Sequence, residues 1–544
     1  MKFDLNHDWQ GNMSSPRSTL GEKTKIHLFL LLSTIWIFTG LIGNSPWIPA
    51  ESENVSMVMD IVLNNSIIAP LAASQDSINN PPLYPFIGAT FVKIFSSTLA
   101  PHDAIRLSNF IWLSLTLLTI GLMTRELWGV GFGRQAGLIF IASIGLIFNV
   151  HTIRPEVSGL LGFALAFYGF ALYQRRPFRA SLVLGFGISI IFLSNGIISL
   201  TSVFITALFL LTLKQWRNKR YYLFCLISTA IALCVIGPWV YLLYNSNPEE
   251  FFSWINKLNA PNGEEFFFYI KNILWFTWPS LPLFIFVLAK NFKDISNVKK
   301  IHLPLFFSIS ILLMLSLSNN IDQIKLMPIL IPFSVVAAGG IDLLRRSSAS
   351  ALNWFGILIF GFFGFIIWFF WLSVMLSFPE IISNRINFLS GNYEVKFEFL
   401  SFIFAFLISG LWLYIIFNIK ISNRSAISNW AIGITMVWVA FIMLVSPLID
   451  NRKSFAPVFQ DVKQHLSRSS SCLYTYNFSP NETNLLHYYS GIRGKDPNKD
   501  IQCRMILLSL NQDSKMPTEY EAWKQIWSGK RIERDKTYYI LLTK

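Results

Sequence analysis

Long apolar runs separated by short polar segments make up most of the chain. Thirteen of these runs approach the roughly 20 residues that an α-helix needs to cross a lipid bilayer. Membrane-spanning β-strands are excluded, because they are about half that length and alternate in polarity. The pattern therefore predicts a polytopic α-helical membrane protein. The predicted spans lie near residues 26–43, 104–124, 132–150, 157–174, 180–196, 197–213, 221–244, 272–289, 301–317, 327–344, 353–378, 399–419 and 427–446.

The last part of the chain, residues 447–544, has a different rhythm. Helical patterns (APVFQDVKQHL, NETNLLHYY and TEYEAWKQIW) alternate with strand-like runs (SCLYTYNF, CRMILLSL and KTYYILLT). This alternation predicts a small α/β domain. Cys472 and Cys503 stand at the starts of two predicted strands, where a disulfide and two buried thiols fit equally well. The expected organisation is an amino-terminal segment 1–25, a transmembrane module 26–446 with a first outer loop at 44–103, and the domain 447–544.

The distribution of charge predicts the orientation in the membrane. The formal net charge is +14, which in a soluble protein would suggest nucleic acid as a partner. Here Lys and Arg gather in every second connection between predicted spans, as they do in the cytoplasmic loops of membrane proteins. We therefore expect a multi-pass protein of the plasma or inner membrane that binds no nucleic acid. Its amino terminus is expected in the cytoplasm, and its carboxy-terminal domain is expected outside.

The first outer loop, residues 44–103, is too long for a hairpin and too apolar for a solvated tail. It is rich in acidic residues, and its pattern predicts two short helices on the membrane surface with carboxylates at their base. The segment NNPPLYP predicts an extended stretch followed by a helix start, because the residue before a proline avoids helical geometry. That segment places Asn80 and Tyr84 at the mouth of the same predicted cleft.

Carboxylates at the outer ends of spans are the candidate catalytic groups, because charges near lipid are costly and tend to serve function. Glu51 and Glu53 follow the first span, and Glu156 lies in HTIRPEVSG at the tight junction between the third and fourth spans. If the two regions meet, one carboxylate can act as general base on the hydroxyl or amine of an acceptor. The alternative is that these residues are solvated loop acids.

Basic residues near the same junctions are candidates for binding a phosphate leaving group. They are Arg106, Arg154 and Lys325, and cations placed in this way stabilise the charge that a departing phosphate acquires. The alternative is that they anchor the ends of helices at the membrane interface. No spacing in the sequence resembles a closed zinc site. The cofactor is unknown, and a divalent metal requirement stays open.

These stretches resemble motifs of the GT-C glycosyltransferases that use polyprenyl-phosphate sugars. The resemblance is to glycosyltransferase family 39, the branch of the aminoarabinose transferases and protein O-mannosyltransferases. That family has an acidic motif in a large outer loop, then EKPPLxYW, then a span that opens with an arginine. The matching stretches here are PAESENV, NNPPLYP and DAIRLSN, followed by RPEVSG and IKLMPILIP. The resemblance implies a GT-C-like bundle of about 13 transmembrane helices with a small outer α/β domain.

The chain departs from the family pattern at three positions. The first catalytic aspartate of the family falls on Ala50, and only the second acid is kept, as Glu51. The lysine before the proline pair is Asn80, and the lysine of the family's Lys-Gly-Pro turn is Asn195. The resemblance therefore leaves three alternatives: an enzyme in which Glu51 or Glu53 replaces the aspartate, a divergent member with a different acceptor, or a member that no longer catalyses transfer.

The resemblance implies an inverting membrane glycosyltransferase, either hexosyl or pentosyl. Its partners would be a polyprenyl-phosphate-linked sugar donor, an extracytoplasmic acceptor (lipid, glycan or protein) and membrane lipid. No GxGxxG motif follows a strand, so a nucleotide-sugar site is not expected. The alternatives are a non-catalytic envelope assembly or binding protein and a polytopic transporter or flippase. A transporter favours internal repeats, which the sequence does not contain.

Overall fold

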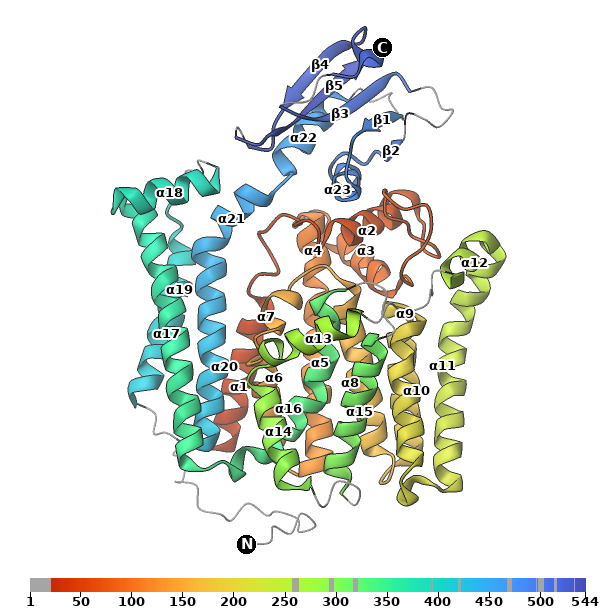
Figure 1. Cartoon of the computed structure of the whole chain (residues 1–544), viewed down its shortest axis with the longest axis vertical. Helices are drawn as coiled ribbons and strands as arrows, with labels where there is room; N and C mark the ends of the chain where they lie inside the picture. Colours follow the sequence, from red (N-terminus) through yellow and green to blue (C-terminus); the bar gives the residue numbers. More distant parts are fainter. Residues whose placement is uncertain are drawn as a thin grey trace.

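The protein is a helical bundle with one end covered by short helices and a small sheet (Figure 1). The computed structural model describes residues 21–256, 264–292, 298–316, 321–391, 393, 395–418, 422–466, 472–495, 497, 503–512, 516–532 and 534–544. Most of the predicted segment 1–25 lies outside these residues. The end that carries the sheet is called the upper end below, and the opposite end the lower end.

The bundle is built from helices that run along the direction between these two ends, together with the four-residue helix α7 that follows α6 (Figure 1). They are α1 (Glu22–Phe38), α5 (Asn109–Trp128), α6 (Phe132–Ile141), α7 (Leu146–Asn149), α8 (Pro155–Leu172), α9 (Pro177–Asn195), α10 (Ile197–Leu211), α11 (Lys219–Ser246), α14 (Ser280–Lys290), α15 (Lys299–Ser316), α16 (Leu330–Gly340), α17 (Arg346–Leu376), α19 (Phe399–Asn418) and α20 (Asn423–Ala440). Shorter elements join or cover them. These are α2 (Ser52–Asn64), α3 (Leu83–Phe95), α4 (Pro101–Leu107), η1 (Lys214–Trp216), α12 (Pro248–Asn256), α13 (Glu264–Phe276), η3 (Gln323–Ile329), η4 (Ile341–Leu343), α18 (Glu380–Ser390), η5 (Phe441–Val445) and α21 (Ser446–Lys453).

The apolar pattern predicted the multi-pass architecture, and the structure confirms it. Within the described residues, nine helices are long and apolar enough to cross a membrane. The run predicted as one span at 272–289 is instead a pair of helices, Phe267–Phe276 and Ser280–Lys290, bent by 98°. Pro279 stands at the break, where its missing N–H ends one helix and suits the start of the next. Counting that pair as one span gives ten, so the figure of thirteen stays a prediction.

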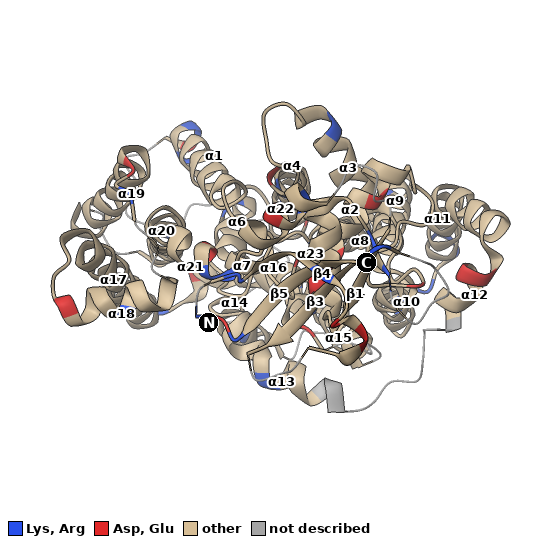
Figure 2. Ribbon diagram, turned by 90° about the horizontal axis from the view of Figure 1, so that it is seen from above, with Lys and Arg blue, Asp and Glu red and all other residues tan. Residues whose placement is uncertain are grey.

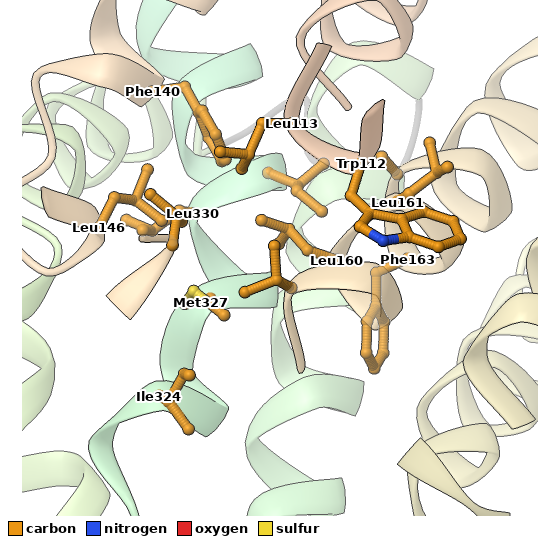
Figure 3. Close-up of a cluster of buried hydrophobic side chains, with 14 of the residues drawn as sticks. Trp112, Leu113, Phe140, Leu146, Leu160, Leu161, Phe163, Ile324, Met327 and Leu330 are labelled. Carbon is orange, nitrogen blue, oxygen red and sulfur yellow. The ribbon is translucent and has the colours of Figure 1, made fainter. Parts of the chain in front are cut away.

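The centre of the bundle is a dry core formed where α8 packs between its neighbours. Side chains of α5, α6, α7, α8, η3 and α16 meet there, among them Trp112, Phe140, Leu160 and Met327 (Figure 3). Small residues let α8 and α9 approach closely, since a Cβ added to Gly187 would lie 2.7 Å from the backbone nitrogen of Ala166. This close packing fixes the start of α8 against the end of α9.

The carboxy-terminal segment forms a five-stranded sheet in the order β2-β1-β3-β5-β4. The central strand β3 runs parallel to β1 and antiparallel to β5. Cys472 and Cys503, which flank this parallel pair, form a disulfide. The predicted α/β character is confirmed, but TEYEAWKQIW is not a helix, because it forms a 3-10 turn and then an edge strand paired with β5. The elements are α22 (Ala456–His465), β1 (Leu473–Tyr476), α23 (Pro480–Ser490), β2 (Gly494–Lys495), β3 (Met505–Asn511), η6 (Thr518–Tyr520), β4 (Lys524–Gly529) and β5 (Thr537–Thr543).

Helix α23 and the turn that follows it connect the sheet to the first loop through polar contacts. His487 Nδ1 lies 2.9 Å from the hydroxyl of Ser56 on α2. The Arg493 guanidinium pairs with the Asp60 carboxylate at 2.7 Å. His487 is 1% exposed, and burial together with the nearby Arg493 charge lowers its pKa to about 4, although Asp60 opposes the shift. The histidine is therefore neutral at the interface between α23 and α2.

We expect this interface to make the protein sensitive to acid. The folded-state pKa of His487 lies below the unfolded value of about 6.5, so its stabilising contribution is complete above that pH and is lost as the pH falls towards 4. The loss at pH 5 is about 2 kcal/mol. His487→Asn keeps a polar group near Ser56 and should flatten the fall in Tm between pH 7 and pH 5. His465→Asn, at an exposed histidine of α22, is the matched control. Parallel Tm profiles for wild type and His487→Asn would contradict this account.

Candidate active site

The upper end of the bundle brings the first loop against the start of α8. Helices α2, α3 and α4 lie there beneath the sheet (Figure 1). Seen from this end, most of the ribbon is uncharged, and the acidic and basic residues stand singly or in small groups (Figure 2). Each charged side chain among these elements therefore has few oppositely charged neighbours. The hydrogen bonds and ion pairs that it makes indicate whether it is structural or available to a ligand.

Glu51, the residue before α2, has a carboxylate that is fully hydrogen-bonded within the protein. It is 3% exposed, and both carboxylate oxygens accept hydrogen bonds from the Arg106 side chain, at 2.9 and 2.6 Å. The backbone N–H groups of Trp47 and Ile153 donate to the same two oxygens at 3.0 and 2.9 Å. A carboxylate offers about four lone-pair positions, and all four are occupied here. This arrangement suits a positioning group rather than a proton acceptor.

The guanidinium of Arg106 is also fully engaged in hydrogen bonds within the protein. Besides Glu51, its guanidinium donates to the carbonyls of Asn44 and Ser45. It therefore joins α4 to the segment before α2, and in this arrangement it is not directed at a ligand. Ile153, which also bonds Glu51, lies just before α8, so the pair of Glu51 and Arg106 links the first loop to the junction that carries Glu156.

Glu156 differs from Glu51 in having a carboxylate oxygen with no partner. Its Oε2 is buried without a hydrogen bond in the described part of the chain. The charged groups that act on it are Arg154, Asp322 and Lys325. A buried acceptor left without a donor is costly, and such groups are retained where a ligand or a reaction uses them. The two predicted acidic regions thus do meet, and of Glu51 and Glu156 it is Glu156 that keeps a buried oxygen without a hydrogen bond to the described residues.

Arg154 connects the two regions directly. Its Nε donates to the carbonyl of Ala50 at 3.1 Å, and its Nη1 pairs with the Asp322 carboxylate. Among the described residues, its Nη2 makes no hydrogen bond. Asp322 also caps η3 by accepting from the N–H of Ile324 at 3.2 Å, and Lys325 lies in the same turn. Of the three predicted cations, Arg154 and Lys325 therefore lie near enough to act electrostatically on Glu156, whereas Arg106 is paired with Glu51.

Asn195 is a second buried acceptor beside Glu156. It ends α9, and its Oδ1 is buried without a hydrogen-bond partner among the described residues. The amide rests against Gly159, one turn along α8 from Glu156, where any added Cβ would collide with it. Gly196 follows with φ of +77°, and a Cβ there would lie 3.9 Å from Pro81 of the first loop. The segment Asn80–Pro81 therefore also reaches this place.

The remaining predicted site residues have local partners. Tyr84 is fully buried, and its hydroxyl donates to Asn109 at 3.0 Å. Burial, reinforced by the charge of Glu51, raises the pKa of Tyr84 above its ordinary value, so the phenol stays protonated. Glu53 accepts from the side chains of Gln75 and Asn79, at 2.7 and 3.2 Å, and so braces its own loop. Within the described residues no group of three or more His, Cys, Asp or Glu side chains is arranged to hold a metal.

Sequence comparison finds no match with protein-family models or with curated proteins. Comparison with solved structures finds ArnT from Cupriavidus metallidurans bound to undecaprenyl phosphate, with a TM-score of 0.71 and 14% sequence identity. The match covers 96% of this chain and 98% of that chain. The apo form of the same protein gives a TM-score of 0.70 at 13% identity. The chain has the GT-C glycosyltransferase fold.

The GT-C fold confirms the architecture that the degenerate motifs suggested. Sequence reasoning missed the pairing of Arg154 with Asp322. The signal was present in the charged positions Asp322 and Lys325 directly before an apolar span. Asn195 was noted only as a missing lysine, and its buried amide oxygen could not be read from the sequence.

We expect the pair of Glu51 and Arg106 to be a main support of the GT-C fold. Glu51→Gln leaves a buried guanidinium without its anion, which typically costs about 3–5 kcal/mol. Asp342→Asn is the matched control, because Asp342 and Arg424 form an ion pair with side chains 34% and 41% exposed, worth at most about 1 kcal/mol. Thermal unfolding of the purified variants in detergent measures both. If Glu51→Gln and Asp342→Asn lowered Tm by similar small amounts, the buried pair of Glu51 and Arg106 would contribute little to stability.

Proposed function

We propose that this protein is a membrane glycosyltransferase that moves a sugar from a polyprenyl-phosphate carrier to an acceptor at the upper end of the bundle. The observation that carries the proposal is the free, buried oxygen of Glu156 among cationic groups in a GT-C fold. The upper end would face the extracytoplasmic side of the plasma or inner membrane, as the distribution of basic loops predicts.

Glu156 would act as the general base. The oxygen of an acceptor hydroxyl, or the nitrogen of an amine, attacks the anomeric carbon and forms the new glycosidic bond with inversion. The bond between the anomeric carbon and the phosphate oxygen breaks at the same time, and the polyprenyl phosphate leaves with that electron pair. The acceptor proton passes to Glu156, whose Oε2 makes no other hydrogen bond.

Arg154 and Lys325 would stabilise the departing phosphate. Both act electrostatically on Glu156, so an anion bound beside them would lie close to the base. Preorganised cations of this kind stabilise charge that develops in the transition state. The amide oxygen of Asn195 would accept a hydrogen bond from a sugar or acceptor hydroxyl, and Asn80 directly precedes Pro81, which reaches the adjacent Gly196. In this scheme Glu51, Arg106 and Tyr84 position the site, and Glu53 holds the loop above it.

Two observations support the donor class. ArnT, which has a similar fold, has been solved bound to undecaprenyl phosphate. Strongly exposed apolar side chains cover the outer helices, for example Phe404 and Leu407 on α19, which fits a substrate that arrives within the bilayer. A lipid-linked donor needs no nucleotide-binding unit, in agreement with the absence of a GxGxxG motif.

We expect Glu156→Gln to abolish transfer without harming the fold. Loss of a general base typically lowers the rate by about 10²–10⁴-fold. The same change neutralises a buried group that lacks a partner, so Tm should stay level or rise. Activity is measured by restoring each variant to cells that lack the protein, and Tm on the purified variants. Glu380→Gln, at an exposed acid of α18 at the same end, is the control and should keep full activity.

Mass spectrometry of lipid-linked sugars and envelope glycans supplies the readout. Cells without the protein, or with only Glu156→Gln, should accumulate one polyprenyl-phosphate sugar and lack the corresponding modified product. Full activity of Glu156→Gln would overturn the catalytic assignment and favour a non-catalytic assembly protein. An unchanged pool of lipid-linked sugars would overturn the donor class.

A further inference from the structure

A patch of arginine and apolar side chains lies at the upper end, where helix α18 meets the carboxy-terminal sheet. Helix α18 lies across the top of α17 and contacts α21 (Figure 1). On α18 itself, Ile381 is 85% exposed and Leu389 is 55% exposed. The neighbouring residues Leu376 of α17 and Phe399 of α19 are 69% and 63% exposed. The exposed apolar surface of the two long helices therefore continues onto α18.

The length of α17 indicates the depth of α18 in the membrane. Helix α17 has 31 residues, so at about 1.5 Å per residue it is about 45 Å long. That length exceeds the hydrocarbon core of about 30 Å and is close to the whole bilayer with its headgroup layers, about 40–45 Å. Arg345 and Arg346 stand at the lower end of α17, as expected for cations at one headgroup layer. Helix α18, which follows the other end, therefore lies at the level of the opposite headgroups.

Two arginines meet at this level beside one aromatic ring. The guanidinium carbon of Arg534, in the turn before β5, lies 4.2 Å from the ring centroid of Phe388. The guanidinium carbon of Arg385 lies 5.4 Å from the same centroid. Both arginines are exposed, and within the part of the chain that the structure describes neither makes a hydrogen bond or an ion pair. Glu380, the exposed acid of α18, is five residues from Arg385 and so lies on a different side of the helix.

Packing between three segments holds the two arginines together. The side-chain amide of Asn451 on α21 donates to the carbonyl of Ser390 at 2.8 Å, at the end of α18. Ile532, which precedes β5, packs so closely on Gly391 that a Cβ added there would lie 2.7 Å from its side chain. The ring and both guanidinium groups therefore belong to segments whose relative positions are fixed. The positive patch is thus part of the fold.

A phosphate group fits the chemistry of this patch. Guanidinium groups bind phosphate oxygens through paired hydrogen bonds, and an anion between two like charges relieves their repulsion. The exposed apolar side chains beside the arginines would contact the acyl chains of the same molecule, as they do in helices that lie on a membrane surface. We propose that Arg385 and Arg534 bind the phosphate group of an anionic phospholipid and so attach the carboxy-terminal sheet to the membrane surface. This site is independent of the proposed transferase activity.

The test is cross-linking of the purified full-length protein with a photoactivatable phosphatidylglycerol, with the labelled peptides mapped by mass spectrometry. We expect saturable labelling of α18 and of the turn that carries Arg534. The double variant Arg385→Gln, Arg534→Gln should need about tenfold more lipid for half-maximal labelling there. The matched control is Arg345→Gln, Arg346→Gln, which removes two exposed cations at the lower end of α17 and should leave this labelling unchanged.

Further arms separate the phosphate from the acyl chains, from free phosphate and from poor folding. The variant Arg385→Lys, Arg534→Lys keeps both charges and should recover most of the labelling. A photoactivatable phosphatidylcholine should label α18 weakly and equally in wild type and in the glutamine variant. Equal labelling by the two lipids, or equal phosphatidylglycerol labelling in wild type and in the glutamine variant, would overturn the site. Suppression of the labelling by millimolar inorganic phosphate would overturn the lipid assignment in favour of a free phosphate.

Discussion

The carboxylate of Glu51 and the guanidinium of Arg106 meet in the interior, where each residue is 3% exposed. Removing two such charges from water costs several kcal/mol each, and good geometry with further hydrogen bonds has to offset that cost. Here the further bonds come from Trp47 and Ile153 on one side and from the Asn44 and Ser45 carbonyls on the other. The pair is stable only when the first loop, α4 and the start of α8 are all in place. The stability of this ion pair therefore depends on correct folding of the whole upper end.

The two acidic residues Glu51 and Glu156 differ in their hydrogen bonding. Glu51 has its lone pairs filled and holds the backbone of two segments, whereas Glu156 lies on the segment so held and has an oxygen without a partner. Arg154 completes the connection by bonding the Ala50 carbonyl next to Glu51. A strained residue, or a buried polar atom without a partner, persists only when the surrounding structure holds it firmly in place. The fully hydrogen-bonded pair of Glu51 and Arg106 holds the segment that carries Glu156 in this way.

The pattern of apolar residues was enough to predict most of the long helices, although the span predicted at 132–150 is two short helices, α6 and α7. It failed where local chemistry overrode composition. Pro279 bends a run that looks like one span, and TEYEAWKQIW follows a helical period yet pairs as an edge strand because β5 offers an unpaired edge. Contact between the loop that carries Glu51 and the junction that carries Glu156 was expected from the layout. Which of the two carboxylates, Glu51 or Glu156, has all its hydrogen-bonding positions filled depends on backbone N–H groups such as that of Ile153. No sequence pattern reveals the direction of those groups.

The loss of lysine at Asn80 and Asn195 changes the electrostatics of the site relative to the family motifs. Two positions that the motifs make cationic are neutral here, so the positive charge available to a leaving phosphate rests on Arg154 and Lys325. Arg154 is shared with Asp322, which lowers the local net charge further. A neutral amide such as Asn195 contributes hydrogen bonds rather than charge, and hydrogen-bonding sites reject ligands that lack the matching group. Under the proposed function, such a site would discriminate among substrates more by hydrogen bonds than by charge. Binding of a polyprenyl carrier would then depend more on contacts made by its lipid chain along the apolar helices.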